Sequence, residues 1–485
     1  MNRLIILAML ALGSGCHGSN PLWQSRAEST VDPFTTVAEG VEPADKHASP
    51  EIRPVVFQEE LTPGKITTTQ TPETVPGHLE SFPSDPALTL AAVESIALAN
   101  SPALAEASAQ VAAARGNWLQ VGLAPNIQVG YSGNEVGSEG EAGQQGGYLS
   151  QQFITNNKLR LNRQVASWQV QEAQSQWSIM RLRVLTDVRS GYYEVLIAQE
   201  RQSLAEELVN IGKQGVAAAD ALFRAEEVSE ADPLRAQVEA ASAQIFLQNA
   251  QNKQNQAWRH LTAVMGTPEM EPQFLEGTLN AEIIEITWQE TLAQILKESP
   301  EMAVAMANIE ETRWSIRRAV AQVRPNVTVQ GGAAYDDASA DAIGNLQVQM
   351  AIPLWNRNQG GIRRAQANAT AAQRAAERIA LDITSRLAKA FQRYESARNQ
   401  VQQYSGDGGI LARAQRSLEL IRAGYQAEEF GVIDLITAQR TFFQTNLAYL
   451  DSLRELWLAA IKIEGQLLGN SLSNSGRQSQ DLDVF

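Results

Sequence analysis

The sequence predicts a mainly α-helical protein with a small β part, built from a duplicated helix–strand–strand–long helix–helix repeat. Three observations predict this class: one motif that occurs twice, long helical segments without proline, and four short segments of alternating polarity. The motif is "AEEVSEADPLRAQ" from Ala225 and "AEEFGVIDLITAQ" from Ala427, which share six residues in register at an offset of 202. A motif repeated at this distance indicates two copies of one structural unit.

A second pair of markers gives nearly the same offset. The dipeptide Ser-Pro occurs at positions 101 and 299, and Pro-Asn occurs at positions 125 and 325, which are offsets of 198 and 200. Because the order of the markers is also preserved, the folded body is predicted to be an internal duplication. We assign residues 87–280 to the first repeat and residues 281–470 to the second.

The predicted helices are unusually long. No proline occurs between Lys158 and Glu227, and at 1.5 Å per residue a helix of this length spans on the order of 100 Å. The second repeat offers a comparable segment, 361–427, but the glycines of "SGDGG" at 405–409 predict a break there. A last helix is predicted from about Ile433 to Leu468, with the leucine spacing of a coiled-coil seam.

Four segments of alternating polarity predict β-strands, at about 124–133, 146–155, 325–335 and 345–354. Strands of about ten residues match a tilted crossing of a lipid bilayer. In the last segment the apolar side chains share one face, which we predict to be lipid-facing: Leu346, Val348, Met350 and Ile352.

Four strands are too few to close a membrane barrel within one chain, because bacterial barrels start at about eight strands and open edges cannot face lipid. Several chains must therefore share one barrel if these strands cross a membrane. A dimer would supply about eight strands and a trimer about twelve, and a lumen wide enough for solutes favours the trimer.

The N-terminus has the composition of a secretory signal, with one basic residue, a short apolar core and small residues before Cys16. Two interpretations are open. In one, residues 1–15 are a lipoprotein signal peptide and Cys16, the only cysteine, becomes the lipidated first residue. In the other, an ordinary signal is cleaved and the cysteine is incidental. Residues 16–86, rich in Pro, Thr, Ser and Glu, are predicted to be a disordered tether, and residues 471–485 a disordered tail.

Composition and motifs argue against several classes of function. A net charge of −15 argues against nucleic-acid binding, which requires a basic surface. The sequence contains no phosphate-binding glycine–lysine loop and no nucleophile elbow, and only His260 of its four histidines falls in the helical body. A metal site needs several converging ligands. We therefore expect no enzyme activity, no cofactor and no bound metal.

Three features together resemble the TolC-type outer-membrane efflux protein family: the duplication, the strand-to-helix junction "IPLWNRNQGGIRRAQA" (352–367), and "YQAEEFGVIDLITAQRTFFQTNLAYLDSLRELWLAA" (425–460). The resemblance covers residues 87–470 and is to the lipid-anchored members of the family. The junction is most similar to that of the metal-efflux branch. It implies a homotrimer in the cell outer membrane, with a shared twelve-stranded transmembrane β-barrel and a long periplasmic α-helical barrel. It also implies a passive conduit for metal ions or drugs, whose partners are a periplasmic adaptor, an inner-membrane pump and outer-membrane lipid.

The same resemblance implies that the two copies of the motif form helix–turn–helix tips at the periplasmic end. The acidic residues of the tips are then adaptor-facing: Glu226, Glu227, Glu428 and Glu429. A periplasmic gate is implied as well, formed as a constriction ring by Asp434, Thr437 and Asp232. Relatives often have a second aspartate where this chain has Thr437, and tend to have glycine where it has Glu226 and Glu428.

The aspartates have a second interpretation that needs no gate. Asp232 precedes Pro233, which suits an N-cap followed by proline at the first helical position, and Asp434 could cap its own helix likewise. Both interpretations of Asp434 stay open at this point. The function has an alternative too: a lipid-anchored periplasmic coiled-coil scaffold, whose hairpins pack on soluble partners instead of crossing a membrane.

Overall fold

The computed structural model describes residues 88–137, 143–279, 285–406, 408–427 and 429–472. The predicted signal with Cys16, the tether, Glu428 and all but the first two residues of the predicted tail lie outside the described residues. The elements of the first repeat are α1 Leu90–Asn100, α2 Pro102–Gln120, β1 Gln128–Asn134, β2 Gln144–Phe153, α3 Lys158–Arg224 and α4 Ala231–Met265. Those of the second are α5 Trp288–Glu298, α6 Pro300–Ala321, β3 Val327–Asp336, β4 Asp341–Met350, α7 Gln359–Ser405, α8 Ile410–Gln426 and α9 Val432–Glu464.

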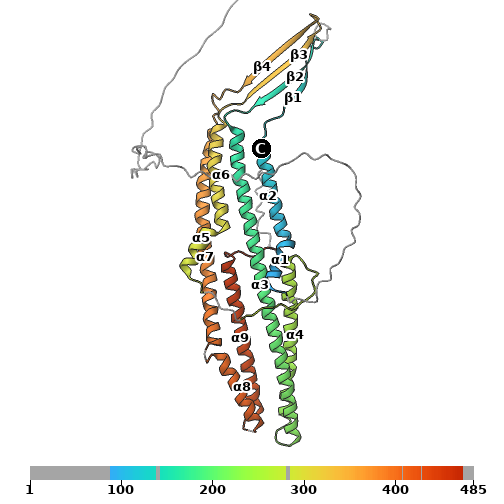
Figure 1. Ribbon diagram of the computed structural model, residues 1–485, viewed down its shortest axis with the longest axis vertical. Helices are drawn as coiled ribbons and strands as arrows, with labels where there is room; N and C mark the ends of the chain where they lie inside the picture. The colour runs from blue at the N-terminus through green and yellow to red at the C-terminus, as the bar shows by residue number, and fades with distance from the viewer. Residues whose placement is uncertain (1–87, 138–142, 280–284, 407, 428, 473–485) are drawn as a thin grey trace, which may run out of the picture. The chain divides into compact units, whose positions relative to one another are not determined.

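The two repeats have the same order of elements, with one difference in their long helices (Figure 1). In the first repeat α3 runs unbroken for 67 residues. In the second repeat α7 ends after 47 residues at Gly406, and α8 begins after Gly409. Gly408 has a φ of 62°, a left-handed conformation that glycine adopts at little cost. The predicted break is therefore confirmed.

Each Ser-Pro marker joins two helices at the start of its repeat. Ser101 lies between α1 and α2, and Ser299 lies between α5 and α6. Both serines are extended, with ψ angles of 117° and 125°, because the residue before a proline avoids helical geometry. Each proline then occupies the first turn of the next helix, where no N–H is needed.

The four strands form one antiparallel sheet in the order β1-β2-β3-β4. Each repeat contributes one hairpin, and β2 pairs with β3 to join the two hairpins. Hydrogen bonds fix the same junction below the sheet: Thr155 Oγ1 donates to the Pro325 carbonyl at 2.6 Å, and Asn156 Nδ2 donates to the Ala321 carbonyl at 3.1 Å. The sheet is thus held by both repeats together.

The hydrophobic core lies among the helices, away from the sheet. One cluster joins α1, α3 and α4, with Val188, Leu261 and Met265 at its centre. Another joins α3, α5, α7 and α9, with Leu387 and Leu456 at its centre. Within this body the sheet lies at one end of the long helices, and the α3–α4 and α8–α9 turns lie at the other (Figure 1).

The strands differ from the predicted ranges by a few residues at their ends. The largest correction concerns β4, which spans Asp341–Met350 and not 345–354. Ile352 lies beyond the strand, because the chain turns there: the Leu354 N–H donates to the Ile352 carbonyl at 3.0 Å. Pro353 between them has no N–H to continue the ladder.

Candidate functional site

The sheet has one mainly apolar and one mainly polar face, with exceptions in β2, where Gln145 and Gln151 lie on the apolar face and Tyr148 on the polar one. Residues directly opposite each other in antiparallel strands share a face, so the register places Val129, Leu149, Gly331 and Leu346 in one row. The same face carries further apolar side chains from all four strands: Tyr131, Phe153, Val327, Val329, Tyr335, Val348 and Met350. The opposite face is mostly polar, with Gln128, Ser132, Gln152, Thr328, Gln330, Asn345, Gln347 and Gln349.

The apolar face of the sheet is largely exposed. Leu346 is 77% exposed and Val348 is 63% exposed, and Met350 beside them is also exposed. Continuous apolar patches of this kind are uncommon on water-facing surfaces and indicate contact with lipid or protein. Three of the four residues predicted to be lipid-facing lie on this face, and the fourth, Ile352, is exposed just past the end of the strand.

Both outer strands of the sheet have a free edge within the described residues. β1 pairs only with β2, and β4 pairs only with β3. Such an edge presents a row of unpaired N–H and C=O groups that another strand can join. The sheet can therefore pair with a further strand at each of its two open edges.

The first tip closes with a left-handed residue at the end of α3. Glu226 has a φ of 64°, and its N–H donates to the Phe223 carbonyl at 3.0 Å. The Glu227 N–H donates to the Leu222 carbonyl, also at 3.0 Å. These two bonds make a Schellman motif, whose left-handed position is usually glycine. Glu226 and Glu227 are both exposed at this turn.

The second tip repeats part of this hydrogen bonding 202 residues later. The Glu429 N–H donates to the Gly424 carbonyl at 2.8 Å, which corresponds to the bond between Glu227 and Leu222. Glu429 is exposed. Gly424 is needed because the Phe430 ring lies against it: a Cβ there would come within 2.2 Å of the ring. The duplication thus extends to individual hydrogen bonds.

A small core joins the two tips. Tyr425, Val432 and Leu435 are buried together, and Leu222 of the other tip packs against them. Burial raises the pKa of Tyr425, and the negative charge of Asp232 raises it further. The Tyr425 hydroxyl has no hydrogen-bond partner among the described residues.

The structure corrects the predicted capping roles of both aspartates. Asp232 is not an N-cap, because α4 begins at Ala231 and places Asp232 inside its first turn, where Arg235 Nη1 lies 3.2 Å from its carboxylate. At the start of α9 the N-cap is Gly431 and Asp434 is three residues further on. The Gly431 N–H donates to Asp434 Oδ2 at 3.1 Å, so Asp434 stabilises the helix start from inside the helix.

Asp434 and Thr437 lie one turn apart on the exposed side of α9. Thr437 Oγ1 donates to the Ile433 carbonyl at 2.7 Å, which leaves the Asp434 carboxylate as the charged group of this surface. Further along α9, Arg440 pairs with Glu239 of α4 through Nη2 and Oε2 at 2.6 Å, and the hydrogen bond to Glu239 raises the pKa of Arg440. This pair joins the two hairpins behind the tips.

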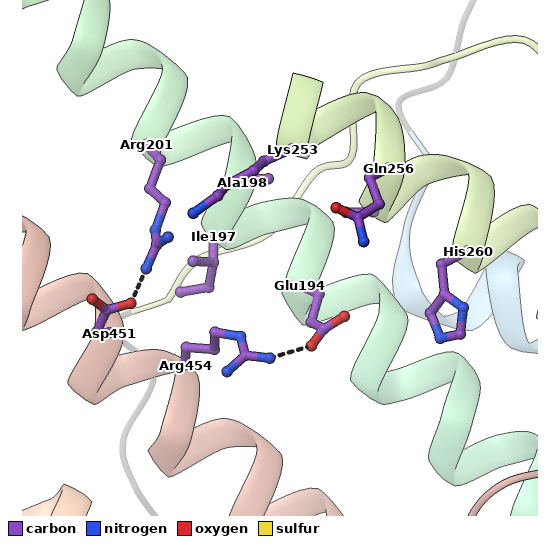
Figure 2. A pocket seen from close by; sticks show the side chains of 10 residues that line it. Glu194, Ile197, Ala198, Arg201, Lys253, Gln256, His260, Asp451 and Arg454 are labelled. Atoms are coloured by element: carbon purple, nitrogen blue, oxygen red, sulfur yellow. Dashed lines mark hydrogen bonds and ion pairs between the residues drawn. The ribbon is translucent and has the colours of Figure 1, made fainter. Parts of the chain in front are cut away.

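A polar cavity of about 550 Å³ lies between α3, α4 and α9 (Figure 2). Two ion pairs cross it: Arg201 with Asp451, and Arg454 Nη2 with Glu194 Oε1 at 2.6 Å. His260 is exposed at its other side. Because both carboxylates that line this cavity are paired with arginines, these two ion pairs hold α3 against α9.

The described residues lack two further features. They contain no helix that is both long and apolar enough to cross a membrane. They also contain no group of three or more His, Cys, Asp or Glu side chains close enough to hold a metal ion.

Comparison with known proteins decides the family. Residues 93–267 and 291–469 match the family model described as outer membrane efflux protein. The chain belongs to the outer membrane efflux protein family. The resemblance predicted from the sequence is therefore confirmed, and the two matched ranges fall one in each repeat. As a member of this family, the protein is an outer-membrane efflux channel and not an enzyme.

Individual relatives agree with this family. The efflux protein is 28% identical over 298 residues to the cobalt-zinc-cadmium resistance protein CzcC of Cupriavidus metallidurans, covering 61% of this chain and 70% of that one. A solved structure of CusC has a TM-score of 0.67 at 19% identity and covers 83% of this chain and 99% of that one. The Campylobacter jejuni CmeC outer membrane channel has a TM-score of 0.66 at 14% identity, covering 83% and 93%. The structural likeness establishes the fold: mainly helical, with a small sheet.

Two features of the tips were missed by sequence reasoning. Tyr425 and the Arg440–Glu239 pair both depend on contacts between segments about two hundred residues apart. For Tyr425 the sequence did contain a signal. The offset of 202 aligns Tyr425 with Phe223, so the hydroxyl is present in only one of the two repeats. No sequence signal was available for the ion pair.

Proposed function

We propose that three copies of this chain form one conduit across the outer membrane, which exports solutes delivered by an inner-membrane pump through a periplasmic adaptor. The observation that carries this proposal is the exposed apolar face of a four-stranded sheet with two free edges. In lipid every backbone polar group must be satisfied, so both edges have to be paired with other strands. Pairing β4 of one copy with β1 of the next closes a ring of twelve strands in a trimer.

In this arrangement Leu346, Val348 and Met350 face lipid and the polar face lines the lumen. The glutamines and serines of that face would make a water-filled passage, as in other barrels with polar interiors. The long helices continue the passage into the periplasm as a helical barrel, ending in the tips.

At the tips we assign Glu226, Glu227, Glu428 and Glu429 to the adaptor-facing surface. Asp434, Thr437 and Asp232 are assigned to the periplasmic gate. Support comes from Asp434, an exposed carboxylate on the first turn of α9, next to the small core that joins the two hairpins. Three copies would bring three such carboxylates around one axis, a ring that attracts cations.

The cargo that we propose is divalent metal ions. This follows from the similarity to a cobalt-zinc-cadmium resistance protein, together with the acidic tips. We also propose that Cys16 carries a lipid anchor in the outer membrane, since the only cysteine follows a signal-like segment.

Conductance in planar bilayers tests the conduit and the gate together. Asp434→Asn removes the charge but keeps an oxygen that can accept from the Gly431 N–H, whereas Asp434→Ala removes both. If Asp434 lines the gate, both variants lower the cation-to-anion permeability ratio by about two-fold or more while the wild type conducts steadily. If Asp434 only stabilises the helix start, Ala alone lowers thermal stability and neither variant changes selectivity.

The coiled-coil scaffold gives the opposite result in two measurements. With the proposed anchor removed by Cys16→Ser, a scaffold would leave the membrane in alkaline carbonate and would give no conductance. A chain embedded by its sheet stays in the membrane pellet, because the apolar face remains in lipid.

A further inference from the structure

Basic residues concentrate where the sheet meets the helices. Four segments meet there, 113–127, 154–168, 314–327 and 351–368, and we call them the collar. They contain ten basic residues and no acidic one, in a chain with 54 acidic and 39 basic residues. The ten are Arg115, Lys158, Arg160, Arg163, Arg317, Arg318, Arg324, Arg357, Arg363 and Arg364.

The four segments of the collar lie side by side. They are the C-terminal ends of α2 and α6 and the N-terminal ends of α3 and α7, next to the strands (Figure 1). Lys158 Nζ donates to the Arg324 carbonyl at 2.5 Å, and Asn358 Nδ2 donates to the Ala319 carbonyl at 2.8 Å. The positive charges are therefore gathered at one level of the molecule.

These charges are not neutralised by the carboxylates that the structure describes. The arginines that form ion pairs with described carboxylates, among them Arg189, Arg386 and Arg454, lie outside the collar. No collar cation is paired with a carboxylate among the described residues. Most of the collar arginines are exposed, including Arg160, Arg357, Arg363 and Arg364. An unpaired group of like charges repels itself and is favoured only if something negative lies outside the chain.

Helix dipoles make the placement more unusual. Lys158 and Arg160 occupy the first turn of α3, and neither α3 nor α7 has an acidic residue in its first turn. A helix N-terminus favours negative charge, as in α4, α6 and α9, which carry an aspartate or glutamate there. Helix stability alone would not select cations at these two ends.

Tryptophan is concentrated in the same segments. Trp118, Trp168, Trp314 and Trp355 are four of the nine tryptophans in the chain. The Arg163 guanidinium lies 3.9 Å from the Trp118 ring centre, and that of Arg317 lies 4.3 Å from the Trp314 ring centre. Trp355 is 86% exposed, directly after the exposed Ile352 and Leu354. Exposed tryptophan beside arginine is typical of the level at which lipid headgroups meet hydrocarbon.

The other end of the sheet has the opposite charge. Glu135, Asp336, Asp337 and Asp341 lie at or beside the two hairpin turns, with no lysine or arginine in 134–137 or 336–341. The sheet thus has an acidic end and a basic end, with the apolar face between them. A membrane-crossing sheet with this pattern would present only its helix-side end to an anionic leaflet.

We propose that the collar binds the phosphate headgroups of anionic phospholipids in the membrane leaflet on the helix side of the sheet. This rests on the proposed function, in which the apolar face crosses the membrane. The collar is continuous with that face, and its charge complements an anionic lipid surface. Each basic side chain near such a surface contributes on the order of a five-fold preference, which weakens with salt.

The test measures insertion of the purified full chain, with Cys16→Ser to remove the proposed lipid anchor, into vesicles of phosphatidylcholine alone and of phosphatidylcholine with phosphatidylglycerol. The collar variant is R160Q/R357Q/R363Q/R364Q. The matched control is R181Q/R259Q/R378Q/R413Q, which removes four exposed arginines elsewhere on the helices. The readout is the fraction of chain that resists alkaline extraction, at low and high salt.

We expect the wild type and the control to prefer vesicles with phosphatidylglycerol by at least about ten-fold at low salt, and less at high salt. The collar variant should insert equally into both kinds of vesicle. Inorganic phosphate at millimolar concentration should not abolish the preference; if it does, the collar is a site for soluble anions and the proposal is wrong. A collar variant that keeps the full preference also overturns it.

Failure of the collar is distinguishable from failure of the proposed function. A wild-type chain that inserts into neither kind of vesicle contradicts the membrane-crossing sheet itself. A wild-type chain that inserts equally into both contradicts only the collar.

Discussion

At the scale of single residues, Glu226 has a backbone conformation that glycine would adopt more easily. Its φ of 64° places the backbone in the left-handed region, which costs roughly 1–2 kcal/mol for a residue other than glycine. The chain nevertheless has glutamate at this turn and at the matching position of the other repeat. An exposed carboxylate that is retained against this strain supports the assignment of the tips to a partner-facing role.

Replacing Glu226 by glycine should stabilise the first tip by about 1 kcal/mol, because the strain is removed. The Glu227 amide, which donates to the Leu222 carbonyl, should then exchange its hydrogen about five-fold more slowly. Hydrogen-exchange mass spectrometry of the tip peptides measures this. Glu227→Gly is the control, since Glu227 has no left-handed backbone and should gain nothing. Unchanged or faster exchange in Glu226→Gly contradicts the strain.

A second residue, Glu172 in α3, destabilises the helical body when its carboxyl is ionised. Burial raises the pKa of Glu172 in α3, and the negative charge of Glu311 in α6 raises it further. A carboxyl whose pKa is raised in the folded state destabilises the fold when ionised, and that loss is recovered as the pH falls through the raised pKa. The effect is modest, because both side chains are partly exposed.

Glu172→Gln should therefore stabilise the fold at pH 8 by less than about 1 kcal/mol, seen as a higher Tm, and the gain should be smaller at pH 4.5, where more of Glu172 is protonated. Thermal unfolding in detergent at the two pH values measures the difference. Glu200→Gln, at an exposed position of the same helix, serves as the control. An equal shift at both pH values would show that the ionisation of Glu172 is not the cause.

At the scale of elements, β4 shows how alternation becomes two different surfaces. Its neighbours Val348 and Gln349 point to opposite faces, and the register extends this separation through β3, β2 and β1. The apolar side of β4 is exposed, so its side chains gain little stability from packing within the described chain. Lipid contact would supply it.

Val348→Arg should block membrane assembly, because arginine near the middle of a barrel's lipid face costs roughly 2–4 kcal/mol. Gln349→Arg is the matched control: it places the same charge one residue away on the polar face and should assemble. In a Cys16→Ser background, oligomer bands in mild detergent and the membrane pellet after alkaline extraction report the outcome. Equal behaviour of the two variants would mean that the faces are assigned wrongly.

At the scale of the whole molecule, the open edges of the sheet require other copies. β1 and β4 are different surfaces, so contact between them is head-to-tail and closes into a ring at a fixed number of copies. The helices impose the same requirement, since exposed apolar residues remain on α4, among them Val238 and Ile245.

Cross-linking should reveal the number of copies. In a Cys16→Ser background, cysteines at Val129 of β1 and Leu346 of β4 should react with a membrane-permeable bismaleimide to give products of two and three chains and no larger ones. Either cysteine alone should give almost none, because equivalent positions lie far apart around a ring. A ladder that continues beyond three chains, or monomer alone, contradicts the trimer.

Local patterns by themselves determined much of this protein. The duplication, the length of α3, the break between α7 and α8 and the two faces of the strands all follow from spacing along the chain. Helical and strand periodicities are set by near neighbours, so they can be seen without a fold. The helix-breaking glycines act locally for the same reason.

The tertiary structure alone decided how the two repeats meet. It paired β2 with β3, buried Tyr425 between the tips, joined Arg440 to Glu239, and moved Asp232 and Asp434 from the N-cap into the first turn of their helices. It also brought four basic segments, the first and last of them more than two hundred residues apart, to one level below the sheet. These contacts depend on the packing of distant segments, which no local pattern encodes.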